Sequence, residues 1–375
     1  MIFFHSLYQF FMLLTIMTIR FNTFSFLTFN FALNISASEQ DTVTLLFTGD
    51  IMQHMPQITA AQQKDGTYNY DPCFQYVKDE ISKADVAIGN LEVPLAGKPY
   101  SGYPQFSAPN EIAFALKRAG FDILVTANNH SCDKQSKGIK GTIKTLDSAG
   151  LQHTGMFLDA AEREKKYPLF FESKNIRFAL LNYTYGTNGL AVPAPHIVNL
   201  IDTVQIFDDI KKAKEKSPDI IIAFMHWGEE YKQLPNMYQK KLADFLVRNG
   251  VQLIIGAHPH VMQPMEKRYD EKGYTKAAIV YSLGNYVSNQ SQPNTDGGAM
   301  ARIKVIKDAN GTRIRSCAYS LVWVYKPIVE GKKQYYILPA GEYQKKENFI
   351  DETHKIKLDL FMKNSRELFN LHNVG

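Results

Sequence analysis

The sequence is poor in cysteine. Its 375 residues include only three, Cys73, Cys132 and Cys317, and these lie far apart along the chain. Such spacing lacks the close cysteine pairs of a thiolate zinc site, so we expect no metal bound in that way. One disulfide is compatible with an oxidising compartment, but the spacing selects no pair.

Dense charge of one sign is also absent. The chain has 42 lysine and arginine residues against 37 acidic ones, a net charge of +5, and most basic residues are scattered. The densest run, at 211–216, favours a solvated helix face. Because no motif of a nucleic-acid-binding fold accompanies it, we expect no nucleic-acid partner. Internal repeats, low-complexity segments and an obvious interdomain linker are missing too, which favours one large domain.

The N-terminal residues differ from the rest. Residues 1–33 contain no acidic residue and only one lysine or arginine, Arg20, among many Phe, Leu, Ile and Met residues. This composition predicts a secretory signal peptide or an uncleaved membrane anchor over residues 1–37. Translation from Met17 would place Arg20 in a short basic segment ahead of the apolar residues 21–33. We therefore expect export to the periplasmic or extracellular side, as a secreted or N-terminally anchored protein. A buried N-terminal helix is the alternative.

Short apolar runs alternate with helical patterns beyond residue 41. Strands are expected at 43–48, 86–88, 123–126, 178–181, 220–225, 253–255 and 278–281. Helices are expected at 74–82, 111–119, 138–149, 203–216 and 237–249. This alternation predicts an α/β fold with a largely parallel sheet covered by helices.

The spacing of apolar residues changes after residue 297. Alternating segments at 299–306 and 313–324 flank Asn310-Gly311, which predicts an antiparallel hairpin. A helix is expected from Asp351 onward. We therefore predict one main domain over residues 42–345 and a C-terminal helical tail over 346–375.

Polar residues follow most of the expected parallel strands. Carboxyl ends of parallel strands meet at one edge of a sheet, where ligands bind, so these side chains are expected to converge. Carboxylates, amide oxygens and imidazoles are ligands of divalent transition metals, and a two-metal site needs about this many. The residues are Asp50, Asn90, Glu92, Asn129, His130, His226, His258 and His260.

Each of these residues also has a purely structural interpretation. Asp50 suits a helix N-cap, and His226 suits a hydrogen-bonded residue at a strand end. The most specific pattern is the pair His258 and His260, which follows a strand and a glycine. His54 is a weaker candidate, and five other histidines have no motif around them: His5, His153, His196, His354 and His372.

The ordered set of motifs resembles the CapA, or poly-γ-glutamate capsule synthesis, family, which is itself similar to calcineurin-like metallophosphoesterases. The matching segments run from about Thr42 to Tyr286 and lie at 47–50, 89–92, 127–130 with Asp133, 226–228, 256–261 and 282–285. The resemblance implies a four-layer α/β/β/α sandwich of two sheets flanked by helices. It also implies that one or two Mn, Fe or Zn ions bind to Asp50, Glu92, Asn129, His226, His258 and His260.

The resemblance gives His130 the role of acting on the leaving group. Two departures bear on the metal ligands. The position two residues after Asp50 is Met52 rather than histidine, and Gly89-Asn90-Leu91-Glu92 replaces the usual Gly-Asp-x-x-Asp pattern, with Glu92 as the carboxylate. These departures leave the number and identity of the ions open.

We therefore expect an exported metal-dependent hydrolase. Its substrate would be a phosphoester or an anionic polymer such as poly-γ-glutamate, and its partners membrane-bound capsule synthesis proteins. Two alternatives remain: a non-catalytic surface component of a capsule machine that binds metal or polymer, and a secreted binding protein without metal.

Overall fold

The computed structural model describes residues 41–346 and 348–374. The expected signal peptide or anchor over residues 1–37 lies outside these residues. Within them, no helix has both the length and the apolar content needed to span a membrane.

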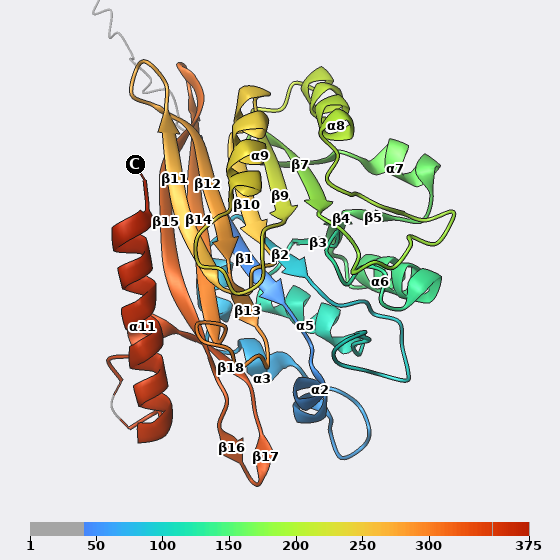
Figure 1. Ribbon diagram of the computed structural model, residues 1–375, viewed down its shortest axis with the longest axis vertical. Coiled ribbons are helices and arrows are strands. Elements are labelled where there is room, and N and C mark those ends of the chain that lie inside the picture. Colours follow the sequence, from blue (N-terminus) through green and yellow to red (C-terminus); the bar gives the residue numbers. More distant parts are fainter. Residues whose placement is uncertain (1–40, 347, 375) are drawn as a thin grey trace, which may run out of the picture. The chain divides into compact units, whose positions relative to one another are not determined.

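Fourteen strands pair into one mixed sheet that has two halves (Figure 1). The first half contains, in spatial order, β4 (Gln152–Thr154), β3 (Ile123–Val125), β2 (Val86–Leu91), β1 (Asp41–Ile51), β14 (Gly297–Asp308), β15 (Gly311–Tyr325) and β18 (Tyr336–Pro339). The second contains β6 (Leu169–Ser173), β7 (Ile176–Thr184), β9 (Ile220–His226), β10 (Leu253–Ala257), β12 (Thr275–Leu283) and β11 (Met262–Tyr269). A short strand, β13 (Asn285–Val287), pairs with the end of β1.

The pairing confirms a mixed α/β fold with a large central sheet. Strands β1 to β4 are parallel to one another, as are β7, β9, β10 and β12. The expected hairpin is formed by β14 and β15. The two halves are not fully separate sheets, because β12 and β15 pair at Thr275 and Ile314.

Apolar side chains form three large clusters that lie on successive faces of the sheet. The first fills the space between the two halves, where the Phe47 ring of β1 and the Phe224 ring of β9 are 6.5 Å apart. The second packs the first half against α3 (Asp71–Phe74), α4 (Lys78–Ser82) and α5 (Glu111–Ala119). The third packs the second half against α8 (Thr203–Glu215) and α9 (Met237–Arg248).

The helices begin where the sequence supplies capping side chains. Asp202 and Asn236 accept hydrogen bonds from backbone amides in the first turns of α8 and α9. The expected helix over 138–149 is α6 (Gln135–Ser148). The expected helix over 74–82 is interrupted, because the adjacent Tyr76 and Val77 pack into different apolar clusters and a turn separates α3 from α4.

The C-terminal segment forms α11 (Glu352–His372), which begins after the N-cap Asp351. Its apolar face buries Leu358, Phe361 and Phe369 beside β11 and β15 (Figure 1). The remaining short elements are α2 (Met55–Ala61), β5 (Met156–Phe157), α7 (Ala160–Lys166), β8 (Ile197–Val198), β16 (Ile328–Val329), β17 (Lys332–Lys333) and α10 (Ala340–Tyr343).

Replacing Phe47 by alanine is expected to destabilise the protein strongly, because the fully buried ring helps to hold the two halves together. We expect a loss of about 3–5 kcal/mol in the free energy of unfolding, measured by urea denaturation. The matched control is Phe114→Ala on α5, where the side chain is 37% exposed and the expected loss is below about 1 kcal/mol. Equal losses in the two variants would contradict this account of the core.

Candidate metal centre

The structure brings the six predicted metal ligands together at the carboxyl ends of the strands. Both halves of the sheet contribute, and none of the six residues is more than 3% exposed. Asp50 lies in β1, Glu92 just after β2, Asn129 after β3, His226 at the end of β9, and His258 and His260 after β10. The predicted convergence of strand ends therefore occurs.

Five of these six residues form two overlapping groups that have the spacing of metal ligands. Ligand atoms of Asp50, Glu92 and His260 all lie within 4.8 Å of one another, and so do those of Glu92, His226 and His258. Glu92 belongs to both groups. Glu92 would therefore be available as a ligand in either group.

The Glu92 carboxylate lies between two imidazoles. Its Oε1 is 3.6 Å from His226 Nε2 and 3.8 Å from His260 Nε2. Neither carboxylate oxygen has a hydrogen-bond partner among residues 41–346 and 348–374. Burial raises the pKa of Glu92 well above its usual value, and the nearby charge of Asp50 adds to the increase. Buried acceptor atoms without donors fit a site that takes a cation.

The Asp50 carboxylate is held by several groups. Its Oδ1 accepts a hydrogen bond from Asn90 Nδ2 at 2.8 Å, and its Oδ2 lies 3.1 Å from His260 Nδ1. The backbone amide of His258 also donates to Oδ2, at 3.3 Å. Burial raises the pKa of Asp50, but the hydrogen bond and charge of His260 outweigh this effect and bring the pKa below its usual value.

His226 and His258 are held as neutral imidazoles. Burial lowers the pKa of His226 well below its usual value and that of His258 to about 3, and in each case a neighbouring imidazole lowers it further. His226 Nε2 lies 2.8 Å from Asn129 Oδ1, and Asn90 Nδ2 lies 3.3 Å from His226 Nδ1. His258 Nδ1 has no hydrogen-bond partner in the part of the chain that the structure describes. Neutral imidazole is the form that binds metals.

The segment that carries His258 and His260 has an unusual backbone. Both residues have positive φ angles, 100° for His258 and 58° for His260. Side chains other than glycine rarely adopt such angles, and strained residues of this kind gather at functional sites. In this conformation a ring nitrogen of each imidazole lies within the ligand spacing of Glu92, and that of His260 also within the spacing of Asp50.

Two glycines of the motifs are required by close packing of the backbone. A Cβ atom on Gly49 would lie 1.9 Å from the carbonyl oxygen of Gly284, and one on Gly256 would lie 1.9 Å from that of Tyr281. Neither position has room for a side chain. These contacts bring the ends of β1 and β10 close enough to neighbouring strands to position Asp50 and the His258 segment.

His130, the predicted catalytic residue, lies beside the metal ligands. Its Nδ1 is 2.8 Å from Asp133 Oδ2, and its ring packs edge-on against Phe106 with centroids 4.6 Å apart. Asp133 Oδ2 also accepts a hydrogen bond from the backbone amide of Phe106. These contacts fix the orientation of the imidazole. The charge of His130 contributes to the lowered pKa of both His226 and His258.

The weaker candidate His54, the departure at Met52 and the motif-less His196 belong to neither group of ligands. His54 packs against Phe106, and burial lowers its pKa to about 4, but it belongs to neither group. Met52 is buried in the apolar cluster that packs against α3 and α5. His196 bonds to Ser136 and to the Leu158 carbonyl.

Sequence reasoning missed several residues around the site. Asn285 Oδ1 lies 3.1 Å from His260 Nδ1. The sequence marked Asn285 only as part of the motif at 282–285 and did not predict this contact. The Tyr185 ring packs 4.5 Å from that of His258 and is 45% exposed, and Tyr231, 43% exposed, has its ring 6.2 Å from that of His260. These half-exposed rings border the site on its solvent side, and no motif in the sequence marks them.

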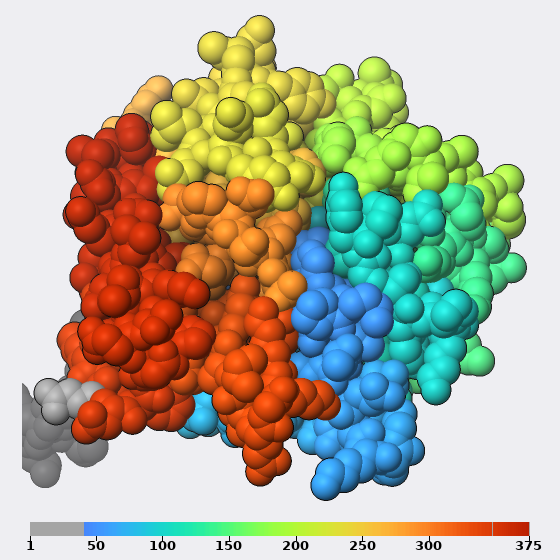
Figure 2. All heavy atoms as spheres, turned by 60° about the horizontal axis from the view of Figure 1, so that its bottom comes forward, coloured from blue at the N-terminus to red at the C-terminus, as the bar shows by residue number. Residues whose placement is uncertain are grey.

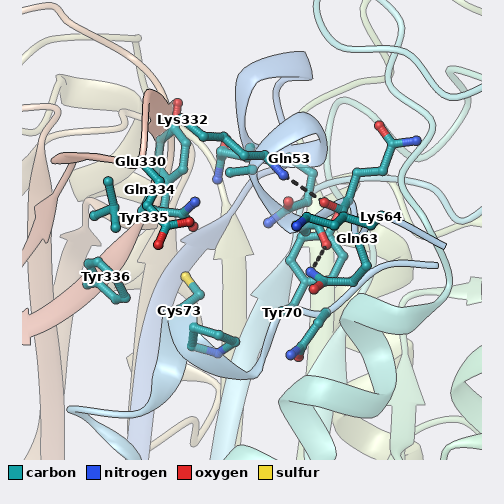
Figure 3. A pocket seen from close by; sticks show the side chains of 17 residues that line it. Gln53, Gln63, Lys64, Tyr70, Cys73, Glu330, Lys332, Gln334, Tyr335 and Tyr336 are labelled. Atoms are coloured by element: carbon teal, nitrogen blue, oxygen red, sulfur yellow. Dashed lines mark hydrogen bonds between the residues drawn. The ribbon is translucent and has the colours of Figure 1, made fainter. Parts of the chain in front are cut away.

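A separate polar cavity of ≈ 460 Å³ lies between α2 and the β16–β17 hairpin (Figure 3). Gln53 and Tyr70 line it, and each carries a buried polar atom without a hydrogen-bond partner within the described ranges. None of the predicted site residues lines this cavity. It is therefore distinct from the metal centre, although Gln53 follows closely after Asp50 in the chain.

Comparison with known proteins gives relatives that match about three quarters of this chain. The chain is 31% identical over 291 residues to the capsule biosynthesis protein CapA of Bacillus anthracis. The matched region covers 74% of this chain and 66% of that protein, which is slightly less than two thirds of its length. It is 28% identical over 284 residues to the PGA biosynthesis protein CapA of Bacillus subtilis (strain 168), covering 74% of this chain and 71% of that protein.

The solved structures found by comparison have low sequence identity to this chain. The calcineurin-like phosphoesterase YfkN from Bacillus subtilis has a TM-score of 0.48 and 15% identity, over 88% of this chain and 98% of the other. The NAD nucleotidase NadN of Haemophilus influenzae has a TM-score of 0.49 and 11% identity, over 88% and 60%.

The model of one protein family matches residues 44–290, a segment that contains all seven predicted site residues. The description of this family is "Bacterial capsule synthesis protein PGA_cap". The chain therefore belongs to the bacterial capsule synthesis protein family.

Proposed function

We propose that this protein is an exported metal-dependent hydrolase of the CapA type, built on a four-layer metallophosphoesterase-type sandwich. It acts in the synthesis, export or anchoring of an anionic capsular polymer such as poly-γ-glutamate, together with membrane-bound capsule synthesis proteins. The observation that supports this proposal most directly is the pair of buried ligand groups that share Glu92.

The ligand groups suit two divalent cations. Asp50, Glu92 and His260 form one site, and Glu92, His226 and His258 form the other, with Asn129 Oδ1 beside His226. The mixture of carboxylate, amide and imidazole donors is compatible with Mn, Fe or Zn. Such ions supply a Lewis acid and an activated water for hydrolysis of a phosphoryl or acyl centre near neutral pH.

His130 supplies the proton in this proposal. Asp133 binds Nδ1 of the imidazole, which leaves Nε2 to face a bound substrate. A histidine oriented by a carboxylate is suited to protonate a leaving group as the scissile bond breaks. Tyr185 and Tyr231 border the centre on its exposed side and contribute surfaces against which a substrate packs.

Removing one imidazole is expected to remove the metal. Elemental mass spectrometry of protein purified without added metal or chelator should find one or two equivalents of Mn, Fe or Zn in the wild type. Loss of a residue that only supports a metal ligand typically weakens metal binding by roughly 10–100-fold. His258→Ala removes a proposed ligand itself, so it should weaken metal binding by at least this much. The control is His372→Ala, which removes an exposed imidazole at the end of α11. Unchanged metal content in His258→Ala would contradict the proposed site.

His130→Ala is expected to separate metal binding from catalysis. The variant should keep its metal, because His130 belongs to neither ligand group, and should hydrolyse substrate about 10²–10⁴-fold more slowly. Hydrolysis is measured on an activated phosphodiester and on poly-γ-glutamate. If the metal-loaded wild type hydrolyses neither, a non-catalytic role in binding metal or polymer is favoured instead. If His130→Ala is as fast as wild type, His130 is not the proton donor.

Metal binding is expected to release a proton from Glu92. The raised pKa of Glu92 means that the free protein keeps this carboxyl protonated at a pH where an ordinary glutamate is ionised, whereas Asp50 is ionised and His226 and His258 are neutral. A cation must displace the proton, so affinity should rise with pH. Isothermal titration calorimetry with Mn²⁺ at about pH 6, in buffers of different ionisation enthalpy, should detect about one released proton.

Glu92→Gln is the control for this measurement, because its amide has no proton to release. The variant should bind metal more weakly, with little buffer dependence. Equal proton release by wild type and Glu92→Gln would show that the proton comes from another group.

A further inference from the structure

Three lysine side chains surround a cavity beside the C-terminal helix. The cavity has a volume of ≈ 390 Å³ and lies between α11, the segment 289–296 and the start of the β16–β17 hairpin. On the face shown in Figure 2, α11 (red) lies beside the orange and orange-red residues of these segments. Lys326, Lys333 and Lys357 line the cavity, so it concentrates positive charge.

The hydrogen bonds of two of these lysines go to uncharged groups. Lys326 Nζ donates to the Gln290 carbonyl at 2.9 Å, and Lys333 Nζ donates to Asn289 Oδ1 at 3.0 Å. Both acceptors are uncharged. No carboxylate of residues 41–346 or 348–374 forms a salt bridge with any of the three ammonium groups, although Asp296 also lines the cavity. Lys326 and Lys333 are partly buried and Lys357 is exposed. Ammonium groups gathered around one cavity are the chemistry of an anion site.

The surroundings of Lys326 agree with this. Burial lowers the pKa of Lys326 to about 8; the charge of Asp296 opposes this effect, and the charges of Lys333 and Lys357 reinforce it. Asp296 already accepts a hydrogen bond from Trp323 Nε1 at 2.8 Å. A bound anion would compensate the repulsion among the three cations.

The cavity adjoins the metal centre through one short segment. Asn285 Oδ1 lies 3.1 Å from His260 Nδ1, and Asn285 Nδ2 donates to Gln290 Oε1 at 2.7 Å. The carbonyl of the same Gln290 accepts the hydrogen bond from Lys326. On the preceding residue, the backbone amide of Asn289 donates to His54 Nδ1, and the Asn289 side chain accepts a hydrogen bond from Lys333. Residues 289 and 290 therefore contact the surroundings of the metal centre and the lysine cavity at once.

The rest of the lining distinguishes a polymer chain from a small anion. Amide side chains of Gln292, Asn294 and Asn364 offer donors and acceptors, and Leu360, which is 57% exposed, offers apolar surface. A chain of carboxylates, amides and methylene groups matches all three kinds of lining, whereas a phosphate would use only the lysines.

We infer that the cavity lined by Lys326, Lys333 and Lys357 binds a stretch of an amide-linked polycarboxylate chain and holds it next to the metal centre. This inference rests on the proposed action on an anionic polymer. It assigns the recognition of carboxylates to residues that lie outside both groups of metal ligands.

The test is binding of an oligo-γ-glutamate to the full-length protein by isothermal titration calorimetry. The triple variant Lys326→Met, Lys333→Gln, Lys357→Gln should bind at least about tenfold more weakly than wild type, because charge-assisted contacts are lost. The matched control is Lys211→Gln, Lys240→Gln, Lys241→Gln, which removes three exposed charges from α8 and α9 and should bind as wild type does. Lys357→Glu, a change at an exposed position on α11, should also weaken binding and cannot disturb the core.

Three results would overturn the inference. The triple variant and Lys357→Glu could bind as tightly as wild type, or the control triple could lose as much affinity as the cavity triple. Polyphosphate could bind with the same lysine dependence while oligo-γ-glutamate does not bind. Metal content is measured in the same preparations. Absence of metal with lysine-dependent binding of the oligomer would refute the proposed hydrolase and leave the inference intact.

Discussion

The burial of the Glu92 carboxylate without a hydrogen-bond donor is the constraint on which the rest of the site depends. An ionised carboxylate in a protein interior is strongly destabilising unless a partner compensates its charge. Glu92 faces His226, which is neutral, and lies near Asp50, which is negative, so the described side chains do not supply that compensation. A divalent cation would supply it, which couples the stability of the centre to its metal content.

Much of the site could be predicted because each ligand follows a parallel strand, and parallel strands end at one edge. Asp50, Asn129 and His258 were found in this way, and α5 has the predicted bounds of residues 111–119. Contacts between side chains that are distant in the sequence produce no comparable sequence pattern. Asn285 was part of a recognised motif, but its contact with His260 depends on the pairing of β13 with β1.

Packing limits prediction elsewhere for a similar reason. Tyr76 and Val77 fit one continuous helical pattern in the sequence, yet they enter different clusters and interrupt the helix. The pairing of Thr275 with Ile314, which joins the two halves of the sheet, involves residues with no distinguishing local pattern. The lysine cavity is another case, because Lys326 and Lys357 approach only when α11 packs against β15.

The ligands of the proposed metal centre come from both halves of the sheet and span positions 50 to 260 of the chain. No short segment of the unfolded chain contains the set, so the centre exists only after both halves have folded and met. Loading of the proposed metal would then follow folding. For a chain that crosses a membrane unfolded, the ions available where it folds, and not those where it is synthesised, would determine which metal occupies the centre.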